Sequence, residues 1–302
     1  SGCRDGRGSE LLSALRQEAE EGDRARVAVT DAALTDPAGP ASLGDLRGSL
    51  LDGAGGRLHR LCGDVAGRRA APVGDELQGI SLDPNFEENQ WVYLVYAPRE
   101  MEGVSPTGVE YPKTTPPGQA PEQLPEGEDE SYWDQWLGYN LLARFKWDEE
   151  NQRLDLDSEQ EIIKVDAQRG QCCHVGADMA WDEEGNLFLS TGDNTPAGTP
   201  GANGYTPINN APGMNPGFDA RRGAGNTNDL RGAILRIKPL DEIEDGAEPG
   251  EGRTYTIPEG NLFDSPEYDD VRNKVREEIY VMGLRNPFRI DYDIESGALF
   301  WG

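Results

Sequence analysis

Short segments in which apolar and polar residues alternate recur along the chain from about residue 75 onward. In each segment an alternating run meets a polar turn with Asp, Asn, Glu or Gly, and a second alternating run rich in aromatic residues follows. Successive side chains of a β-strand point to opposite faces of a sheet, so this pattern predicts antiparallel β-hairpins. Four hairpins are expected, at residues 80–96, 143–157, 179–192 and 288–302.

A fifth pair of strands is predicted in GAILRIKPL, residues 232–240, and GRTYTIP, residues 252–258, with an acidic linker between them. Almost no helical periodicity separates the hairpins. This spacing favours an all-β fold and, within that class, a β-propeller whose blades are four-stranded antiparallel sheets. A β-sandwich is the alternative, although its strands are usually spaced more evenly and joined by shorter loops.

The first 74 residues lack this pattern, because they are rich in Ala, Gly, Arg and Asp and contain few aromatic residues. A helix at residues 11–27 is the one element expected there, and the segment 1–74 is otherwise expected to be loosely structured or disordered. The abrupt change of pattern at Gly74 is also what a shifted reading frame would produce. The propeller domain is therefore expected to span residues 75–302.

Two long segments between the hairpins, residues 101–135 and 194–229, are rich in Pro, Gly and Asn. These residue types do not sustain strand ladders, so both segments are expected to be loops. Long loops on a rigid scaffold are where binding residues usually lie, and solvated connections are the alternative.

The chain is strongly acidic, with 56 Asp and Glu side chains against 28 Lys and Arg and a net charge of −28. Such a surface repels phosphate groups, so nucleic acid is not an expected partner. The acidity resembles that of halophilic proteins, and an acidic protein from a bacterium of ordinary salinity is the alternative. The sequence contains no run of about 20 apolar residues, so no membrane span is expected.

Ser1-Gly2-Cys3 matches the end of a bacterial lipobox, although a match of three residues also arises by chance. The expected location is secreted, whether extracellular, periplasmic or at the cell surface, with a lipid anchor at Cys3 as one option.

The densest group of reactive side chains lies in QRGQCCHVGADM, residues 168–179, where Cys172 and Cys173 precede His174. A histidine is suited to accepting a proton near neutral pH, because the unperturbed pKa of imidazole is about 6.5. His174 is therefore a candidate general base, and a packed or solvated histidine is the alternative.

Several states of the cysteine pair remain open. Cys172 and Cys173 are reduced thiols on opposite faces of a strand, one of them is bonded to Cys3 or Cys62, or they form a vicinal disulfide, which is strained and typical of functional sites. Nucleophilic catalysis by a Cys-His pair is disfavoured, because neighbours on a strand point apart and no third orienting group is evident. The four cysteines show no C-x-x-C spacing, so no structural zinc site is expected.

A second group lies in GLRNPF, residues 283–288. Arg285 offers a planar fork of donors for a carboxylate or carbonyl, and Asn286 offers both a donor and an acceptor, although this segment alone also fits a simple turn. STGDNT, residues 190–195, contains Asp193 and fits a turn or an oxygen-ligand site for calcium, but its spacing differs from that of the EF-hand loop.

Five segments occur in the order and approximate spacing seen in the glucose/sorbosone dehydrogenase family: ELQGISLDPNFEENQWVYLVYAP, QCCHVGADMAWDEEGNLFLSTGDN, NTNDLRGAILRI, YTIPEGNLF and EIYVMGLRNPFRIDYDIESGALFWG. From about residue 74 to 302 the chain resembles this family of soluble quinoproteins, above all its bacterial and archaeal sugar dehydrogenases. The resemblance implies a six-bladed β-propeller, pyrroloquinoline quinone (PQQ) and calcium as cofactors, and a small sugar as substrate. It also implies an electron acceptor such as a cytochrome or a quinone.

The resemblance further implies roles for single residues. His174 matches the catalytic base, which removes the proton of the anomeric hydroxyl of an aldose or related sugar while hydride passes to the quinone carbon. Arg285 and Asn286 match the pair beside the quinone, and Arg285 stabilises the negative charge that develops on the quinone oxygen. His174, Arg285 and Asn286 are thus the expected cofactor-binding residues. Calcium polarises the quinone through ligands that the sequence does not identify, and Cys172 and Cys173 are expected to line the channel beside the cofactor.

The matched segments supply sequence for about four blades of such a propeller, so an incomplete propeller is expected, and catalysis by this chain alone is not. Two alternatives to a sugar dehydrogenase remain. A calcium-dependent lactonase-like hydrolase would need acidic metal ligands at the channel mouth, and a non-catalytic propeller would bind carbohydrate or protein on its long loops.

Overall fold

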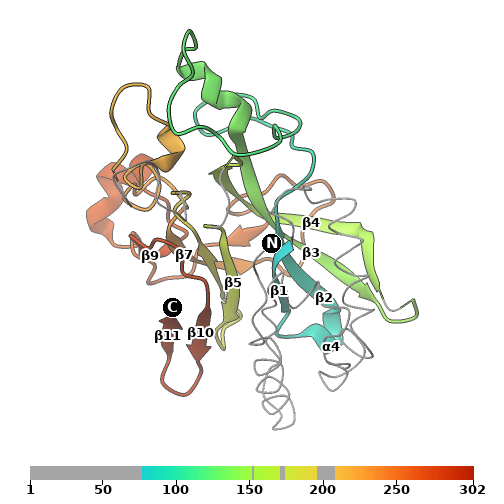
Figure 1. Ribbon diagram of the computed structural model, residues 1–302. Coiled ribbons are helices and arrows are strands. Elements are labelled where there is room, and N and C mark those ends of the chain that lie inside the picture. The colour runs from blue at the N-terminus through green and yellow to red at the C-terminus, as the bar shows by residue number, and fades with distance from the viewer. Residues whose placement is uncertain (1–76, 152, 171–173, 196–207) are drawn as a thin grey trace.

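The computed structural model describes residues 77–151, 153–170, 174–195 and 208–302, and its strands form three antiparallel sheets (Figure 1). The first sheet has the order β1-β2-β3-β4. Its strands are β1 (Leu77–Leu82), β2 (Trp91–Tyr96), β3 (Leu137–Asp148) and β4 (Arg153–Gln168).

The second sheet has the order β5-β6-β7-β8, and β9 also pairs with β7. Its strands are β5 (Gly176–Trp181), β6 (Leu187–Thr191), β7 (Ala233–Pro239), β8 (Tyr255–Thr256) and β9 (Ile279–Met282). A hairpin of β10 (Ile290–Asp293) and β11 (Ala298–Trp301) forms the third sheet. The helical turns are α4 (Phe86–Asn89), η1 (Glu130–Trp136), η3 (Pro216–Phe218) and η4 (Pro266–Lys274).

All five predicted strand pairs are confirmed. The pairing of β7 with β8 is shorter than the sequence indicates, because only Lys238 and Pro239 pair with Thr256 and Tyr255. Strand β9 and the helical turns were not predicted. The stretch that forms β9 is only four residues long and follows a polar segment, so it shows no clear alternation.

The three sheets lie one after another, with β5 between its two neighbours. On one face of β5, Met179 and Trp181 join a large core cluster with Tyr93 of the first sheet. On the other face, Ala180 joins a smaller cluster with Ile290 of the hairpin. Successive sheets packed face to face are what a propeller requires, and the sheets in the described residues do not close a ring. The all-β class and the incomplete propeller are confirmed.

The first two sheets approach most closely where β1 meets β5. A Cβ atom on Gly79 would lie 1.9 Å from the carbonyl oxygen of Ala177, so only glycine permits this approach. Ala177 itself has a φ of 77°, a left-handed conformation that L-residues with a side chain rarely adopt. The indole Nε1 of Trp181 also donates to Ser81 Oγ at 2.9 Å. These contacts fix β5 against the first sheet.

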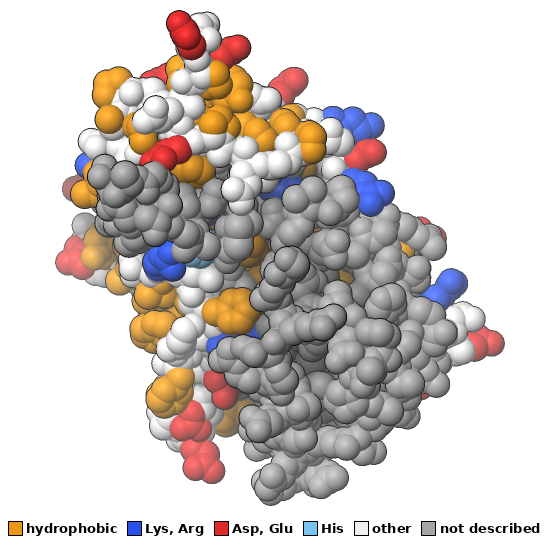
Figure 2. Space-filling model, viewed as in Figure 1, with side chains coloured by type: hydrophobic (Ala, Val, Ile, Leu, Met, Phe, Trp, Pro, Cys, Tyr) orange, Lys and Arg blue, Asp and Glu red, His pale blue; other side chains and the backbone are white. Residues whose placement is uncertain are grey.

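The long loops predicted at residues 101–135 and 194–229 contain no long strand where they are described. The two loops contact each other. Asn215 N donates to the carbonyl oxygen of Glu122, and Gln123 forms an isolated bridge with Met214. The first loop, at the top of Figure 1, is packed around Trp133 and Trp136. Figure 2 shows that this part of the surface carries many apolar side chains beside scattered acidic ones. The two loops therefore form a cap above the ends of β3 and β4.

Within the described residues, no helix has the length and apolar character that a membrane crossing would need. The expected disorder of residues 1–74 and the helix at 11–27 fall outside the described residues.

Candidate functional site

His174 forms a buried pair with Asp193. His174 stands two residues before β5 and Asp193 two residues after β6, and the pairing of Gly176 with Thr191 brings these two strand ends together. The Nδ1 atom of His174 lies 3.0 Å from Oδ1 of Asp193, and the side chains are only 3% and 2% exposed. A carboxylate only accepts hydrogen bonds, so in a neutral imidazole Nδ1 carries the proton, and Nε2 is left as an acceptor.

The carboxylate of Asp193 is itself held in place. Its Oδ1 accepts hydrogen bonds from Thr195 N at 2.9 Å and from Thr195 Oγ1 at 2.8 Å. Both donors come from the residue two positions further on, so residues 193–195 form a tight side-chain turn. The carboxylate that orients His174 is therefore fixed by its own loop.

The main chain packs tightly around this pair. A Cβ atom on Gly192 would lie 2.0 Å from the carbonyl oxygen of His174 and 3.0 Å from Oδ1 of Asn286. Gly192 N also donates to the carbonyl oxygen of Val175 at 3.0 Å. A side chain at position 192 would separate His174 from Asp193, so the glycine is needed for the close approach.

The structure brings the predicted segment with Arg285 and Asn286 to the same place. Asp193 N donates to the carbonyl oxygen of Arg285 at 2.9 Å, and Gly176 N donates to Oδ1 of Asn286 at 3.0 Å. Residues 285 and 286 therefore brace both strand ends that carry the His174–Asp193 pair. The three residues predicted from the sequence lie together, although they are separated by more than 100 positions in the chain.

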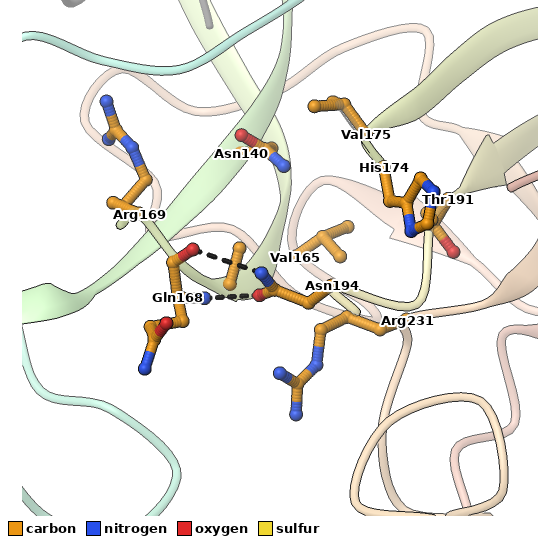
Figure 3. A pocket seen from close by; sticks show the side chains of 11 residues that line it. Asn140, Val165, Gln168, Arg169, His174, Val175, Thr191, Asn194 and Arg231 are labelled. Atoms are coloured by element: carbon orange, nitrogen blue, oxygen red, sulfur yellow. Dashed lines mark hydrogen bonds between the residues drawn. The ribbon is translucent and has the colours of Figure 1, made fainter. Parts of the chain in front are cut away.

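A pocket opens beside His174, between the end of β4 and the ends of β5 and β6 (Figure 3). It is lined by residues of both sheets and of the loop before β7: Asn140, Val165, Ala167, Gln168, Arg169, His174, Val175, Thr191, Gly192, Asn194 and Arg231. Arg285 and Asn286 are not part of this lining. Figure 3 shows Gln168 and Asn194 facing each other, joined by two hydrogen bonds.

Two arginines, Arg231 and Arg169, line the pocket. Arg231 makes two hydrogen bonds to the carboxylate of Asp229, from Nε at 2.8 Å and from Nη2 at 2.5 Å. Burial alone would lower the pKa of Arg231, but the bonds and charge of Asp229 outweigh it and raise that pKa, so the side chain stays charged. Arg169 is 7% exposed and donates from Nη1 to the carbonyl oxygen of Pro98 at 3.0 Å. These donors suit a ligand rich in carboxylate and carbonyl oxygens.

Polar residues of this site that the sequence did not single out include Asn140, Gln168, Arg169, Asn194 and Arg231. The sequence indicated Asp193 only as a turn residue or calcium ligand and made no third orienting group evident, whereas the structure shows Asp193 in that place beside His174. Its role was visible in principle, because Asp193 closes the hairpin that begins at His174.

Cys172 and Cys173 lie outside the described residues, so the proposed states of this pair remain predictions. Among the described residues, no group of three or more His, Cys, Asp and Glu side chains is arranged to hold a metal ion. The calcium expectation for residues 190–195 likewise remains a prediction.

A family model described as Glucose / Sorbosone dehydrogenase matches residues 71–301. Solved structures with similar folds include a glucose dehydrogenase, 18% identical, with a TM-score of 0.42 and coverage of 76% of this chain and 43% of that one. The apo-form soluble aldose sugar dehydrogenase from Escherichia coli is 17% identical, with a TM-score of 0.42 and coverage of 76% and 43%. The PQQ-bound aldose sugar dehydrogenase from Streptomyces coelicolor is 16% identical, with a TM-score of 0.40 and coverage of 78% and 44%.

The chain thus spans less than half the length of these solved structures. No curated protein matches the sequence.

Proposed function

Because the chain belongs to the glucose/sorbosone dehydrogenase family, as the match over residues 71–301 shows, we propose that it supplies the general base of a PQQ-dependent sugar dehydrogenase. The substrate is an aldose or related sugar, oxidised at its anomeric hydroxyl. The observation that carries this proposal is the buried His174–Asp193 pair beside a pocket with two guanidinium groups.

His174 acts through the nitrogen that does not face Asp193. Because Nδ1 donates its proton in a hydrogen bond to the carboxylate, Nε2 accepts the proton of the anomeric hydroxyl. The imidazolium that results is stabilised by the negative charge of Asp193 at 3.0 Å. Loss of this proton and of the hydride on the same carbon converts the anomeric C–OH group to a carbonyl. Both electrons of the C–H bond leave with the hydride.

The pocket, small as it stands, carries donors of the kind that the cofactor needs. PQQ carries three carboxylates and an ortho-quinone, so its binding requires cations and amide donors in an otherwise acidic protein. Arg169 and Asn140 supply a guanidinium and an amide, and Arg285 with Asn286 adjoins the His174–Asp193 pair. Arg231 adds a second guanidinium, whose charge is paired with Asp229. When bound, PQQ supplies the two-electron acceptor for the hydride.

Calcium belongs to the same proposal as the ion that polarises the quinone, and its ligands remain to be identified. A cytochrome or a quinone is proposed as the final electron acceptor.

The proposal is tested by reconstituting the full-length protein with PQQ and calcium and measuring reduction of an artificial electron-accepting dye with a panel of aldoses. We expect sugar-dependent reduction that requires PQQ and that falls at least about 100-fold in His174→Ala, because a general base typically contributes that much. The matched control is His59→Ala, since His59 is the other histidine in the chain.

Dye reduction that is independent of PQQ, or equal activity in the two histidine variants, would contradict the proposal. Hydrolysis of lactones by the same preparation would instead favour the lactonase-like alternative. Sugar binding without turnover would favour a binding propeller.

A further inference from the structure

Asn194, which follows Asp193, has an unusual main-chain conformation. Its φ is 64°, and among the described residues only two other non-glycine residues, Gln90 and Ala177, have a positive φ. Asparagine tolerates this left-handed region better than most residues with a side chain. The residue is also only 6% exposed, so its polar side chain must find partners inside the protein.

The partners of Asn194 lie in the other sheet. Oδ1 of Asn194 accepts a hydrogen bond from Gln168 N, and Nδ2 of Asn194 donates to the carbonyl oxygen of Gln168 at 3.1 Å. The amide side chain thus pairs with the main chain of the last residue of β4 in both directions, as one strand residue pairs with another (Figure 3). Asn194 therefore joins the loop that carries Asp193 to the first sheet.

Gln168, the partner of Asn194, is itself held in place by hydrogen bonds. The side-chain amide of Gln168 pairs with that of Asn215, with Nε2 of Gln168 donating at 2.5 Å and Nδ2 of Asn215 donating at 3.1 Å. Asn215 is fully buried, and its Nδ2 also donates to the carbonyl oxygen of Pro121 in the cap. We call Asn194, Gln168 and Asn215 the amide chain. None of its side-chain atoms is among the buried polar atoms that lack a partner.

We propose that Asn194 is a positioning residue that, through the amide chain, holds Asp193 against His174 and so fixes the tautomer of the histidine. It touches neither ring nitrogen. Instead it sets the left-handed main chain between Asp193 and Thr195, the two residues whose hydrogen bonds hold the carboxylate. The kinetic part of this inference rests on the proposed function, whereas the effect on the histidine does not.

The position of Asn194 explains why it governs the pair rather than only the stability of the loop. On the second-sheet side the loop is anchored by Asp193 N, which donates to the carbonyl oxygen of Arg285. On the first-sheet side its anchor is the amide pair with Gln168. Gln168 and His174 line opposite walls of the same pocket, so the length of this link sets how far the histidine lies from the other wall.

The test replaces Asn194 with glycine, which adopts the same φ but has no amide. His174 and His59 are the only histidines, so a sample labelled with ¹⁵N-histidine gives two sets of ring signals, assigned with His59→Ala. Spectra at pH 8, where histidines are mostly neutral, report which ring nitrogen carries the proton. For the unmodified protein we expect His174 to be protonated on Nδ1.

For Asn194→Gly we expect mixed tautomers of His174, seen as a shift of both ring nitrogens toward their average. The PQQ-loaded variant should lose about 10- to 100-fold in kcat with little change in KM, as small displacements of catalytic groups do. The matched control is Asn186→Gly, which removes a buried amide bonded to Asp182 at the far end of the same hairpin. It should leave the signals of His174 unchanged.

The inference is wrong if folded Asn194→Gly shows the unmodified spectrum of His174. Asn194→Asp provides a second variant if the glycine variant does not fold, because it keeps the acceptor for Gln168 N and replaces the donor to the Gln168 carbonyl with a carboxylate oxygen. A shift toward mixed tautomers is expected there as well, and no shift would also overturn the inference. If no preparation oxidises sugars, the proposed function fails, but the spectra still decide the role of Asn194.

Discussion

The Nδ1 atom of His174 and the Oδ1 atom of Asp193 lie 3.0 Å apart, at a place where both side chains are almost completely excluded from solvent. The buried carboxylate has one histidine and one threonine as partners, and this arrangement fixes the orientation and the tautomer of the imidazole. It gives the predicted base at position 174 a defined direction of action.

The first prediction concerns this pair. In Asp193→Asn the side chain can present its amide group to Nδ1, which favours the tautomer with the proton on Nε2 and blocks proton acceptance there. We expect kcat for sugar oxidation to fall at least about 100-fold. Asp182→Asn, at the other end of the same hairpin, is the control for loss of a buried carboxylate. Equal kcat values in the two variants would argue against an orienting role for Asp193.

The second prediction concerns Asp178, which is 2% exposed on β5. Its Oδ2 accepts a hydrogen bond from Ile290 N at 2.8 Å, whereas its Oδ1 has no hydrogen-bond partner among the described residues. Burial raises the pKa of this carboxyl to about 6, although Ile290 N and the charge of Arg289 oppose the rise.

A pKa above its unfolded value of 3.8 means that the folded state binds this proton more tightly than the unfolded state. The contribution of Asp178 to stability is therefore greatest below pH 4 and is lost as the pH rises to about 6, by up to about 3 kcal/mol. Asp178→Asn should remove this dependence. Urea unfolding of both proteins between pH 4 and pH 8 measures the difference, and a difference that does not vary with pH would refute the prediction.

The third prediction concerns Gly79, whose added Cβ atom would lie 1.9 Å from a main-chain oxygen of β5. Gly79→Ala should lower the free energy of unfolding by at least about 2 kcal/mol, because neither main chain can move without separating the first two sheets. The control is Gly246→Ala, where no atom lies within 4 Å and only the positive φ of 73° opposes a side chain. Thermal or urea denaturation compares the two, and equal losses of stability would mean that the sheets are less tightly packed than the structure indicates.

The hairpins were predictable because each is a local event. Residues that pair across β5 and β6, such as Met179 and Leu189, are close in sequence. The alternation of apolar and polar residues in both strands therefore falls within one continuous segment. Strand β2 is a partial exception, since its sequence WVYLVY, residues 91–96, contains no charged residue and shows no polar face. Its aromatic and β-branched residues still identify it as a strand.

The candidate site was only partly predictable, because its other half depends on how separate sheets stack. No local pattern indicates that Asn286 accepts a hydrogen bond from Gly176, or that Asn194 pairs with Gln168. Asparagine and glutamine in loops usually face solvent, so their burial here follows from the packing of the first sheet on the second. His174 was found because histidine is rare in this chain and because its neighbours resemble a family motif.

The placement of β5 between two neighbours also has a consequence for the nascent chain. The bonds from Gly176 to Asn286 and from Ile290 to Asp178 span 110 and 112 positions. A ribosome adds about 5–20 residues per second, so roughly 5 to 20 s separate the synthesis of β5 from that of its second neighbour. During that interval Ala180 and Phe188 lack the apolar surface of the last hairpin, and the emerging chain cannot complete its own site.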